Sequence, residues 1–314
     1  MATYITVDGG TTNTRLYLVR ERKVTDAIKL SAGINNGVDN LKKYLKEGIS
    51  AILNRNHLDS QEVSKILASG MITSEYGMCE ISHIELPVDL RALNRSVCVA
   101  SFQEISQIDW VFIRGIKTKC TSLECADMVR GEETEIMGIV QQVGQDAMYI
   151  LPGSHSKHLL VDKNGNITDI RTMMSGELFS AVIQHTILNG ATDFEHASID
   201  KDALKLGFDF CSSLGINEAL FKTRVMKNIF NATKEFCYAY LLGVVLCNEV
   251  KAIMNCANSV IVIGGQSHFK QAISMLLDIY CDNKTVITLS EEVVETSVAL
   301  GAVNIYEGSF NFEV

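Results

Sequence analysis

The chain carries one pattern twice, and this repeat limits its fold more than any other feature. Residues 148–176 follow residues 5–33 at a constant offset of 143. The offset pairs Gly10 with Gly153, Thr11 with Ser154, Leu16 with Leu159, VTDAI (24–28) with ITDIR (167–171), and Gly33 with Gly176. Each copy contains, in this order, a strand, a Gly-hydroxyl turn, a second strand, a tight turn and a third strand. A supersecondary unit that occurs twice predicts two domains of similar structure.

Apolar periodicity and turn residues predict the elements of both halves. In the first half, we expect strands at 3–7, 14–20, 24–30, 65–69 and 110–114, and helices near 38–54 and 133–142. In the second half, we expect helices near 176–189, 216–228, 231–254, from about 266, and near 294–306, with strands at 260–264 and 285–289. The predicted fold is α/β, with similar domains at 1–145 and 146–314. Each starts with an antiparallel three-stranded meander, and a cleft lies between them.

Composition limits the partners and the compartment. A length of 314 residues favours two domains over one core, and 47 % apolar residues are ordinary for a globular protein. A net charge of −9 argues against nucleic-acid and acidic-membrane partners, although it allows an anionic small molecule at a local positive site. The apolar run at 239–247 is too short to cross a bilayer, and no export signal is apparent. We therefore expect a cytoplasmic protein.

Nine cysteines occur without a C-x-x-C pair, and Cys120 and Cys125 lack a matching second pair for zinc. We expect all nine to be reduced, mostly as core residues.

The first turn, DGGTTNTR (8–15), has the composition of a phosphate-binding hairpin. Glycine allows a ligand to approach the backbone closely, and successive N–H groups can form a concave anion site. We expect this site to include Gly9, Gly10, Thr11, Thr12 and Asn13. Asp8 would repel phosphate directly, but it can hold Mg²⁺ through water, and Mg²⁺ commonly bridges nucleotide phosphates. The alternative is a plain hairpin of turn-forming residues.

Two more turns suit a nucleotide. The second copy of the turn, GSHSK, offers Gly153, Ser154, His155 and Lys157 as phosphate contacts, although His155 can equally order the turn. VIVIGGQSHF is a buried strand that runs into a helix through Gly264 and Gly265, where an adenosine could lie on the backbone. A simple strand-to-helix turn would look the same. The sequence contains neither G-x-x-x-x-G-K-[ST] nor a strand followed by G-x-G-x-x-G.

In this order, the three turns resemble those of the actin-like sugar kinase superfamily. Four longer stretches are similar to the 2-dehydro-3-deoxygalactonokinase family: ASGMITSEYG (68–77), DMVRGEETEIMG (127–138), LPGSHSKHL (151–159) and RTMMSGELF (171–179). The resemblance spans nearly the whole chain. It implies two ribonuclease H-like domains, with ATP and Mg²⁺ as cofactors. Many members of the family have Trp at the position of Gly9, residues 112–120 are more basic than usual, and the C-terminal TSVALGA is only loosely similar.

The reaction needs a carboxylate that accepts the proton of the sugar hydroxyl. In related sugar kinases, that carboxylate lies at the start of a helix shortly before the second phosphate hairpin. The matching residues are Glu132 and Glu133, with Asp127 as a lesser candidate. Acidic residues also stabilise a helix N-terminus without any catalytic role. The sequence does not decide between the two glutamates.

A sugar-acid substrate brings a carboxylate of its own, so the site should offer a cation or backbone donors. Arg15, Arg130 and Lys157 lie in motif regions, although Lys157 could equally contact ATP. The loop after the strand at 65–69 offers Gly70, Met71, Ser74 and Glu75 as sugar contacts, and an ordinary surface loop is the alternative.

The favoured function is phosphorylation of the 6-hydroxyl of 2-dehydro-3-deoxy-D-galactonate by ATP, as the resemblance implies. The alternatives are a kinase of another sugar acid or hexose, and a nucleotide-dependent sensor of the same superfamily. Expected partners are the sugar acid and ATP, with no nucleic acid and no membrane. The sequence leaves open whether the protein forms a homodimer.

Overall fold

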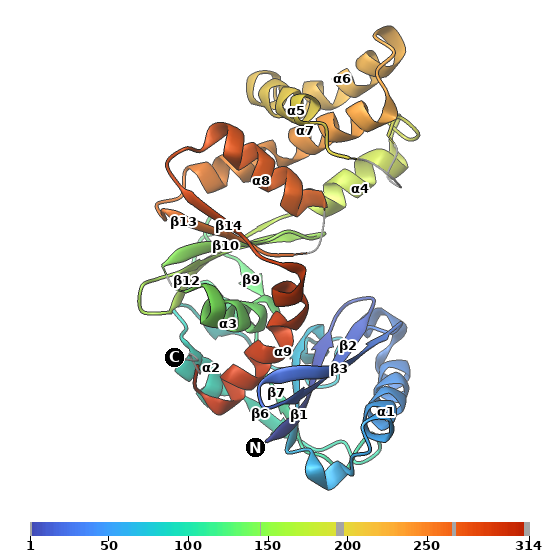
Figure 1. Cartoon of the computed structure of the whole chain (residues 1–314), viewed down its shortest axis with the longest axis vertical. Helices are drawn as coiled ribbons and strands as arrows, with labels where there is room; N and C mark the ends of the chain where they lie inside the picture. Colours follow the sequence, from blue (N-terminus) through green and yellow to red (C-terminus); the bar gives the residue numbers. More distant parts are fainter. Residues whose placement is uncertain (1, 145, 193–197, 266–267, 311–314) are drawn as a thin grey trace. The chain divides into compact units, whose positions relative to one another are not determined.

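The computed structural model describes residues 2–144, 146–192, 198–265 and 268–310 (Figure 1). The chain forms two compact units. Unit 1 contains the chain up to Asp146, Leu160–Ile170 and the segment from Glu292 onward, and unit 2 contains Ala147–Leu159 and Arg171–Glu291. The expected domains 1–145 and 146–314 follow the order of the chain. The two units are instead defined by which segments pack together, and the C-terminal segment from Glu292 onward belongs to unit 1.

Unit 1 is built on a six-stranded sheet with the order β3-β2-β1-β4-β7-β6. Its strands are β1 (Thr3–Gly9), β2 (Thr14–Arg20), β3 (Lys23–Leu30), β4 (Lys65–Gly70), β6 (Cys98–Ala100) and β7 (Trp110–Phe112). The first three strands pair antiparallel as the predicted meander, and β4 then joins β1 in parallel. In this register Asp8 lies between Arg15 on β2 and Ser69 on β4. The sheet therefore places the end of β1 at its centre.

One face of this sheet is covered by α1 (Val38–Arg55), which Figure 1 shows beside β2 and β3. The helix buries Leu41, Leu45, Ile49 and Ile52, which recur at helical spacing. They pack in one core with Ile5 and Val7 of β1 and with apolar residues of β2 and β4. Burial of a side chain of this kind contributes roughly 1.5–3 kcal/mol.

The helices α3 (Glu132–Val143) and α9 (Glu291–Glu307) cross in unit 1 at two glycines. A Cβ on Gly138 would lie 1.9 Å from the Ser297 carbonyl oxygen, and one on Gly301 would lie 1.8 Å from that of Thr134. Only glycine permits this separation, so the backbones touch directly. Buried Asn304 of α9 also donates to the Met137 carbonyl at 3.0 Å. This crossing fixes α3, whose N-terminus carries the two candidate glutamates.

Unit 2 repeats the order of unit 1 in the sheet β12-β11-β10-β13-β14. The strands of this sheet are β10 (Ala147–Leu151), β11 (Ser156–Val161), β12 (Ile167–Met173), β13 (Val260–Ile263) and β14 (Thr285–Thr288), of which the parts of β11 and β12 within Leu160–Ile170 are counted with unit 1. As β4 does beside β1, β13 joins β10 in parallel, and β14 then joins β13 in parallel. Its helices are α4 (Ser175–His185), α5 (Lys201–Leu214), α6 (Ile216–Ile229), α7 (Lys234–Met254) and α8 (His268–Tyr280). The repeated sheet order confirms the predicted α/β fold of two similar halves.

The sequence missed some elements and overextended one. The helix predicted to reach residue 189 ends at His185, because Thr186 is extended, with ψ at 179°. Helix α5 was not predicted, although Asp200 caps its Ala203 N–H at 2.8 Å. The short α2 (Leu90–Ser96) and the small sheet of β5 (Ile84–Glu85), β8 (Ile116–Lys117) and β9 (Met128–Val129) were also missed. Strands of two residues are too short to produce a period in the sequence.

Helix α7 is long and apolar enough to cross a membrane by length and composition, and 78 % of its most apolar window is buried. Within the described parts of the chain it is the one such helix. The core helix of a globular protein has the same properties, so the helix is weak evidence for a membrane span.

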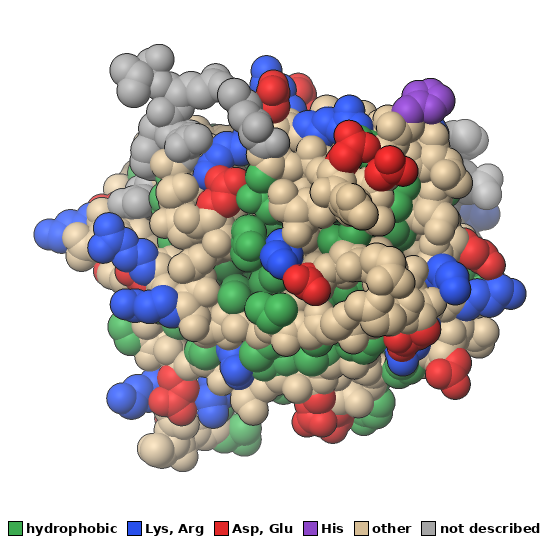
Figure 2. Space-filling view, turned by 90° about the horizontal axis from the view of Figure 1, so that it is seen from below, with side chains coloured by type: hydrophobic (Ala, Val, Ile, Leu, Met, Phe, Trp, Pro, Cys, Tyr) green, Lys and Arg blue, Asp and Glu red, His purple; other side chains and the backbone are tan. Residues whose placement is uncertain are grey.

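Charged side chains of both signs share the molecular surface. Figure 2 shows Lys and Arg side chains interspersed with Asp and Glu side chains around hydrophobic ones on the face that it draws. Acidic and basic side chains are therefore mixed on this face.

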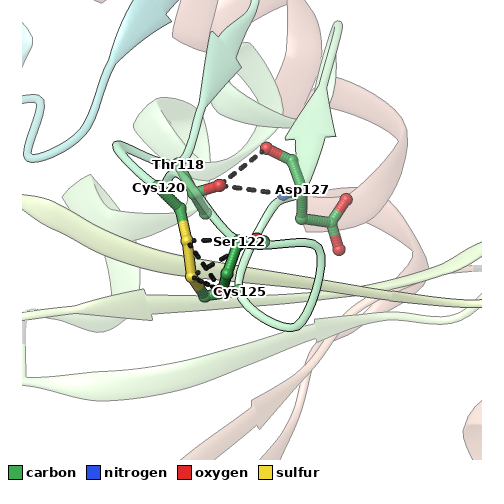
Figure 3. Close-up of a disulfide and its surroundings, with 5 residues drawn as sticks. All are labelled: Thr118, Cys120, Ser122, Cys125 and Asp127. Atoms are coloured by element: carbon green, nitrogen blue, oxygen red, sulfur yellow. Dashed lines mark hydrogen bonds between the residues drawn. A yellow bond between two sulfur atoms is a disulfide. The ribbon is translucent and has the colours of Figure 1, made fainter.

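Cys120 and Cys125 form a disulfide in the loop between β8 and β9 (Figure 3). The expectation that all nine cysteines are reduced is therefore wrong for this pair, and the other seven are free. The loop turns tightly enough to bring the two Cα atoms to 6.0 Å, within the usual range for a disulfide. At its base Thr118 and Asp127 bond to each other, with an Asp127 N–H to Thr118 Oγ1 distance of 2.8 Å.

Candidate active site

The first glycine turn, which we call hairpin 1 (residues 10–13), is tied to the segment after β3. Gly10 N–H donates to the Asn13 carbonyl at 3.0 Å, and Asn35 N–H donates to the Thr11 carbonyl at 3.1 Å. A Cβ on Gly33 would lie 2.5 Å from that same Thr11 carbonyl oxygen, so glycine is required there. The side chains of Thr11, Thr12 and Asn13 are exposed. Hairpin 1 is thus a fixed turn whose polar side chains can contact a ligand.

Asp8 ends β1 directly before hairpin 1, and its side chain is 22 % exposed. Arg15 Nη1 lies 3.4 Å from its carboxylate. Burial raises the pKa of Asp8 above its usual value, the charge of Arg15 lowers it, and the carboxylate of Glu132 raises it. The predicted metal ligand therefore has another carboxylate close enough to disfavour its charged form.

Three backbone segments of unit 1 converge at glycines beside Asp8. A Cβ on Gly70, at the end of β4, would lie 2.7 Å from the Gly9 carbonyl oxygen and 3.5 Å from Asp8 Oδ1. A Cβ on Gly131, directly before α3, would lie 3.2 Å from the Gly70 Cα. Side chains at these positions would force the segments apart. The glycines therefore bring Asp8, hairpin 1 and the N-terminus of α3 together.

The two candidate glutamates differ at the start of α3. Glu133 is fully buried, where it accepts the Gly131 N–H at 2.8 Å and the Thr134 hydroxyl at 2.9 Å. Burial, reinforced by the Glu132 charge, raises the pKa of Glu133 to about 8. Glu132 is half-buried and accepts the Arg130 N–H at 3.1 Å. Glu133 thus stabilises the helix start, and Glu132 is the more accessible carboxylate.

Glu135 is a third carboxylate of this group that the sequence analysis missed. Burial, Glu132 and Asp8 together raise the pKa of Glu135 to about 8. Its position three residues after Glu132 places both on one helix face, and this spacing was a signal that could have identified it.

A divalent cation fits the charge of this group. In the described residues, no three His, Cys, Asp or Glu side chains are close enough to bind a metal directly. Asp8 can therefore hold Mg²⁺ only through water or together with ligand oxygens, which is how Mg²⁺ commonly binds. Mutual repulsion among Asp8, Glu132 and Glu135 would be relieved by a cation nearby.

Much of the predicted sugar loop is bonded to itself. Ser74 is buried, and its hydroxyl donates to the Met71 carbonyl at 2.7 Å. The Arg130 guanidinium donates to the Thr73 carbonyl at 2.6 Å and to the Ile81 carbonyl at 3.1 Å. Arg130 therefore holds this loop against the start of α3. Met71 is half-buried and Glu75 is exposed.

In unit 2, the second glycine turn, hairpin 2 (residues 152–155), contacts the first turn of α4. A Cβ on Gly176 would lie 2.3 Å from the Gly153 carbonyl oxygen, and Glu177 N–H donates to the Ser154 carbonyl at 2.9 Å. The imidazole of His155 lies 2.5 Å from the Glu177 carboxylate. Ser154 and His155 are exposed, whereas Lys157 is buried.

The predicted adenosine turn lies beside hairpin 2. Gly264 N–H donates to the Ile150 carbonyl at 2.8 Å. A Cβ on Gly265 would lie 2.7 Å from the Pro152 carbonyl oxygen. The two parts of unit 2 expected to hold one nucleotide are therefore neighbours.

Two further features were not foreseen. Buried Glu249 of α7 bonds to residues on both sides of hairpin 2, and only the tertiary structure reveals this. A cavity of about 870 Å³ in unit 1 is lined by Tyr4, Arg22, Asn304, Glu307 and neighbouring residues. Its lining includes none of the predicted site residues.

A sheet order that occurs twice, each time with a polar glycine turn after its first strand, defines a protein of the actin-like ATPase and sugar kinase fold. Comparison with solved structures agrees. A candidate 2-dehydro-3-deoxygalactonokinase protein from Sinorhizobium meliloti superposes with a TM-score of 0.77 at 20 % identity, covering 96 % of this chain and 99 % of that one. The chain belongs to the 2-keto-3-deoxy-galactonokinase family, whose model matches residues 8–296.

Two curated relatives agree with this assignment. The chain is 24 % identical over 257 residues to 2-dehydro-3-deoxygalactonokinase of Escherichia coli (strain K12), covering 80 % of each protein. It is 26 % identical over 226 residues to a probable 2-dehydro-3-deoxygalactonokinase of Rhizobium meliloti (strain 1021), covering 70 % of this chain and 66 % of the relative.

Proposed function

We propose that this kinase transfers the γ-phosphoryl group of ATP to the 6-hydroxyl of 2-dehydro-3-deoxy-D-galactonate. Family membership supports the reaction class and the substrate class. The observation that carries the proposal is the glycine contact of Gly9, Gly70 and Gly131, which gathers Asp8, hairpin 1 and the glutamates of α3. Phosphoryl transfer needs a phosphate site, a metal anchor and a proton acceptor, and these residues supply all three.

Glu132 is our choice for the proton acceptor. It is the more accessible of the two glutamates, whereas Glu133 is buried and engaged by Gly131 and Thr134. A general base must reach the hydroxyl whose proton it accepts. Glu133 then keeps the helix start in place, so that Glu132 is presented at a fixed position.

Asp8 would hold Mg²⁺ through water, and the ion would neutralise charge on the ATP phosphates. The N–H groups and hydroxyls of hairpin 1 would orient the same phosphates. Arg15, which is exposed beside Asp8, is the proposed partner of a substrate oxygen or phosphate. We assign Arg130 and Ser74 to holding the sugar loop rather than to direct contact, because their hydrogen bonds lie within the protein.

Hairpin 2 and the Gly264-Gly265 turn would bind the nucleotide from unit 2, with Ser154 and His155 exposed for contact. Because the reaction consumes ATP, we place the enzyme in the cytoplasm.

The test is an ADP-release assay with a panel of keto-deoxy sugar acids and hexoses, followed by NMR of the product to locate the phosphate. We expect turnover with 2-dehydro-3-deoxy-D-galactonate, phosphate on O6 and no turnover when Mg²⁺ is chelated. A higher kcat/KM for another sugar acid or a hexose would identify that sugar as the substrate in place of 2-dehydro-3-deoxy-D-galactonate. ATP turnover that is independent of every sugar, with no phosphorylated product, would indicate a nucleotide-dependent sensor.

A further inference from the structure

A buried carboxylate in unit 2 joins the two elements that form and contact hairpin 2. Glu249 of α7 is 1 % exposed. Its carboxylate accepts the Ser156 hydroxyl at 2.5 Å and His158 Nε2–H at 3.2 Å, both from β11. It also accepts the hydroxyl of Ser175, the first residue of α4. A charged group is seldom this deeply buried unless its hydrogen bonds are satisfied.

The donors around Glu249 stabilise its charged form. Burial by itself opposes ionisation, but the bonds from His158, Ser156 and Ser175 outweigh it and hold the pKa of Glu249 below its usual value. The other ring nitrogen of His158, Nδ1, is buried without a partner. A bare nitrogen costs less there than an unpaired N–H, so His158 donates through Nε2.

The two sides of this network meet again at hairpin 2. Ser156 directly follows the hairpin, and Ser175 directly precedes Gly176 and Glu177, which contact its backbone. Hairpin 2 therefore lies in a closed loop of contacts, from Glu249 through Ser156 to the hairpin, and back through the start of α4 and Ser175. A change at Glu249 would loosen both sides at once.

We propose that Glu249 is a positioning residue for the nucleotide: it fixes hairpin 2 in the conformation that binds the phosphates of ATP, without touching ATP itself. The inference rests on the proposed function to the extent that hairpin 2 holds these phosphates. It adds a residue, 93 positions from Ser156 in the sequence, that sets nucleotide affinity.

The test is Glu249→Gln, which keeps the side-chain volume but replaces an acceptor oxygen by an amide donor that faces hydroxyl and imidazole donors. We expect the Kd of MgATP, measured by calorimetry without sugar acid, to rise by about ten-fold or more. The KM for MgATP should rise in parallel, while the KM for the sugar acid stays within about two-fold. A merely structural role would not separate the two KM values.

The matched control is Tyr240→Phe on the same helix. It removes a buried hydrogen bond to the Ala219 carbonyl, 3.0 Å away, that takes no part in the network. This variant should melt at a lower temperature and bind MgATP as the wild type does. If it weakened MgATP binding as much as Glu249→Gln, loss of stability alone would explain the effect, and the inference would fail.

If Glu249→Gln does not fold, Ser175→Ala tests the inference in its place. This variant removes one donor to Glu249 and leaves the carboxylate bonded to β11. It should raise the Kd of MgATP by a smaller factor, about three-fold or more. Wild-type affinity in a folded Glu249→Gln, or in Ser175→Ala, would overturn the inference. A wild type that binds MgATP without phosphorylating any sugar leaves this test intact. A wild type that binds no MgATP would overturn both proposals.

Discussion

Replacing each of the two glutamates at the start of α3 by glutamine should separate catalysis from stability. Glu132→Gln removes the proposed proton acceptor and keeps the shape of the side chain. Its kcat should fall by about 10²–10⁴-fold, the usual contribution of a general base. The KM for MgATP should change by no more than a few-fold. Glu133→Gln should keep kcat within a few-fold of the wild type, because the side chain of Glu133 is fully buried.

The effect of Glu133→Gln should appear in stability. Burial and Glu132 hold the pKa of Glu133 at about 8, against 4.5 for an ordinary glutamate. The folded protein thus keeps a proton that the unfolded chain releases above pH 4.5, so stability falls as the pH rises. Between pH 5 and pH 7 this group lowers the free energy of unfolding by about 1.4 kcal/mol per pH unit, about 3 kcal/mol in all. Glutamine cannot ionise, so the variant lacks this decline.

The assay pairs steady-state kinetics with urea unfolding of the same proteins at pH 5, 6 and 7. Glu135 titrates in the wild type and in the variant, so the difference between their two curves isolates Glu133. Glu47→Gln, at an exposed position of α1, is the control for a lost surface charge. A 10²-fold loss of kcat in Glu133→Gln with an active Glu132→Gln would reverse the assignment. Parallel stability curves would show that Glu133 is already ionised in this range.

Three further predictions test other parts of the site. Asp8→Asn should fold normally by circular dichroism and lose at least about 10²-fold in kcat at saturating Mg²⁺; near-normal turnover would remove Asp8 from the mechanism. Gly70→Ala and Gly37→Ala both introduce a side chain at a φ near +80°, but only Gly70 has a backbone oxygen within 2.7 Å of the new Cβ. Gly37→Ala should cost about 1–3 kcal/mol in urea unfolding, and Gly70→Ala about 1–3 kcal/mol more together with a lower kcat; equal losses would refute the close approach. The double variant Cys120→Ser, Cys125→Ser should lose at most about 2 kcal/mol and keep its kcat, since the disulfide closes a short loop that Thr118 also holds; a larger loss, or a fall in kcat, would give the disulfide a role that the contacts do not indicate.

The features that the sequence predicts well are those that depend on near neighbours in the chain. Glycine turns after apolar strands identify hairpins 1 and 2, and the offset of 143 pairs Gly33 with Gly176. In the structure each of these glycines lies against the turn of its own copy, with a Cβ clash at 2.5 Å from Thr11 and 2.3 Å from Gly153. The repeat in sequence is thus a repeat of one backbone contact.

The features that the sequence missed depend on residues far apart in the chain. Arg130 has the chemistry of a substrate ligand, and nothing in its neighbourhood indicates that its guanidinium would bond to Thr73, 57 positions away. Glu249 is one of two acidic residues in α7, and it lies 74 positions from its partner Ser175. Its role becomes visible only when β11, α4 and α7 are packed together.

The roles of Glu132 and Glu133 depend both on the local sequence and on contacts between residues far apart in the chain. The sequence indicates a carboxylate at a helix start, and helix geometry requires that neighbouring side chains point in different directions. Neither argument says which of the two is buried, because that depends on how α3 meets the rest of unit 1. Gly131 supplies the answer: its close contact with Gly70 fixes the helix start, and its N–H bonds to Glu133. A helix start held in this way leaves Glu132 the more accessible of the two carboxylates, which is why we propose Glu132 as the proton acceptor.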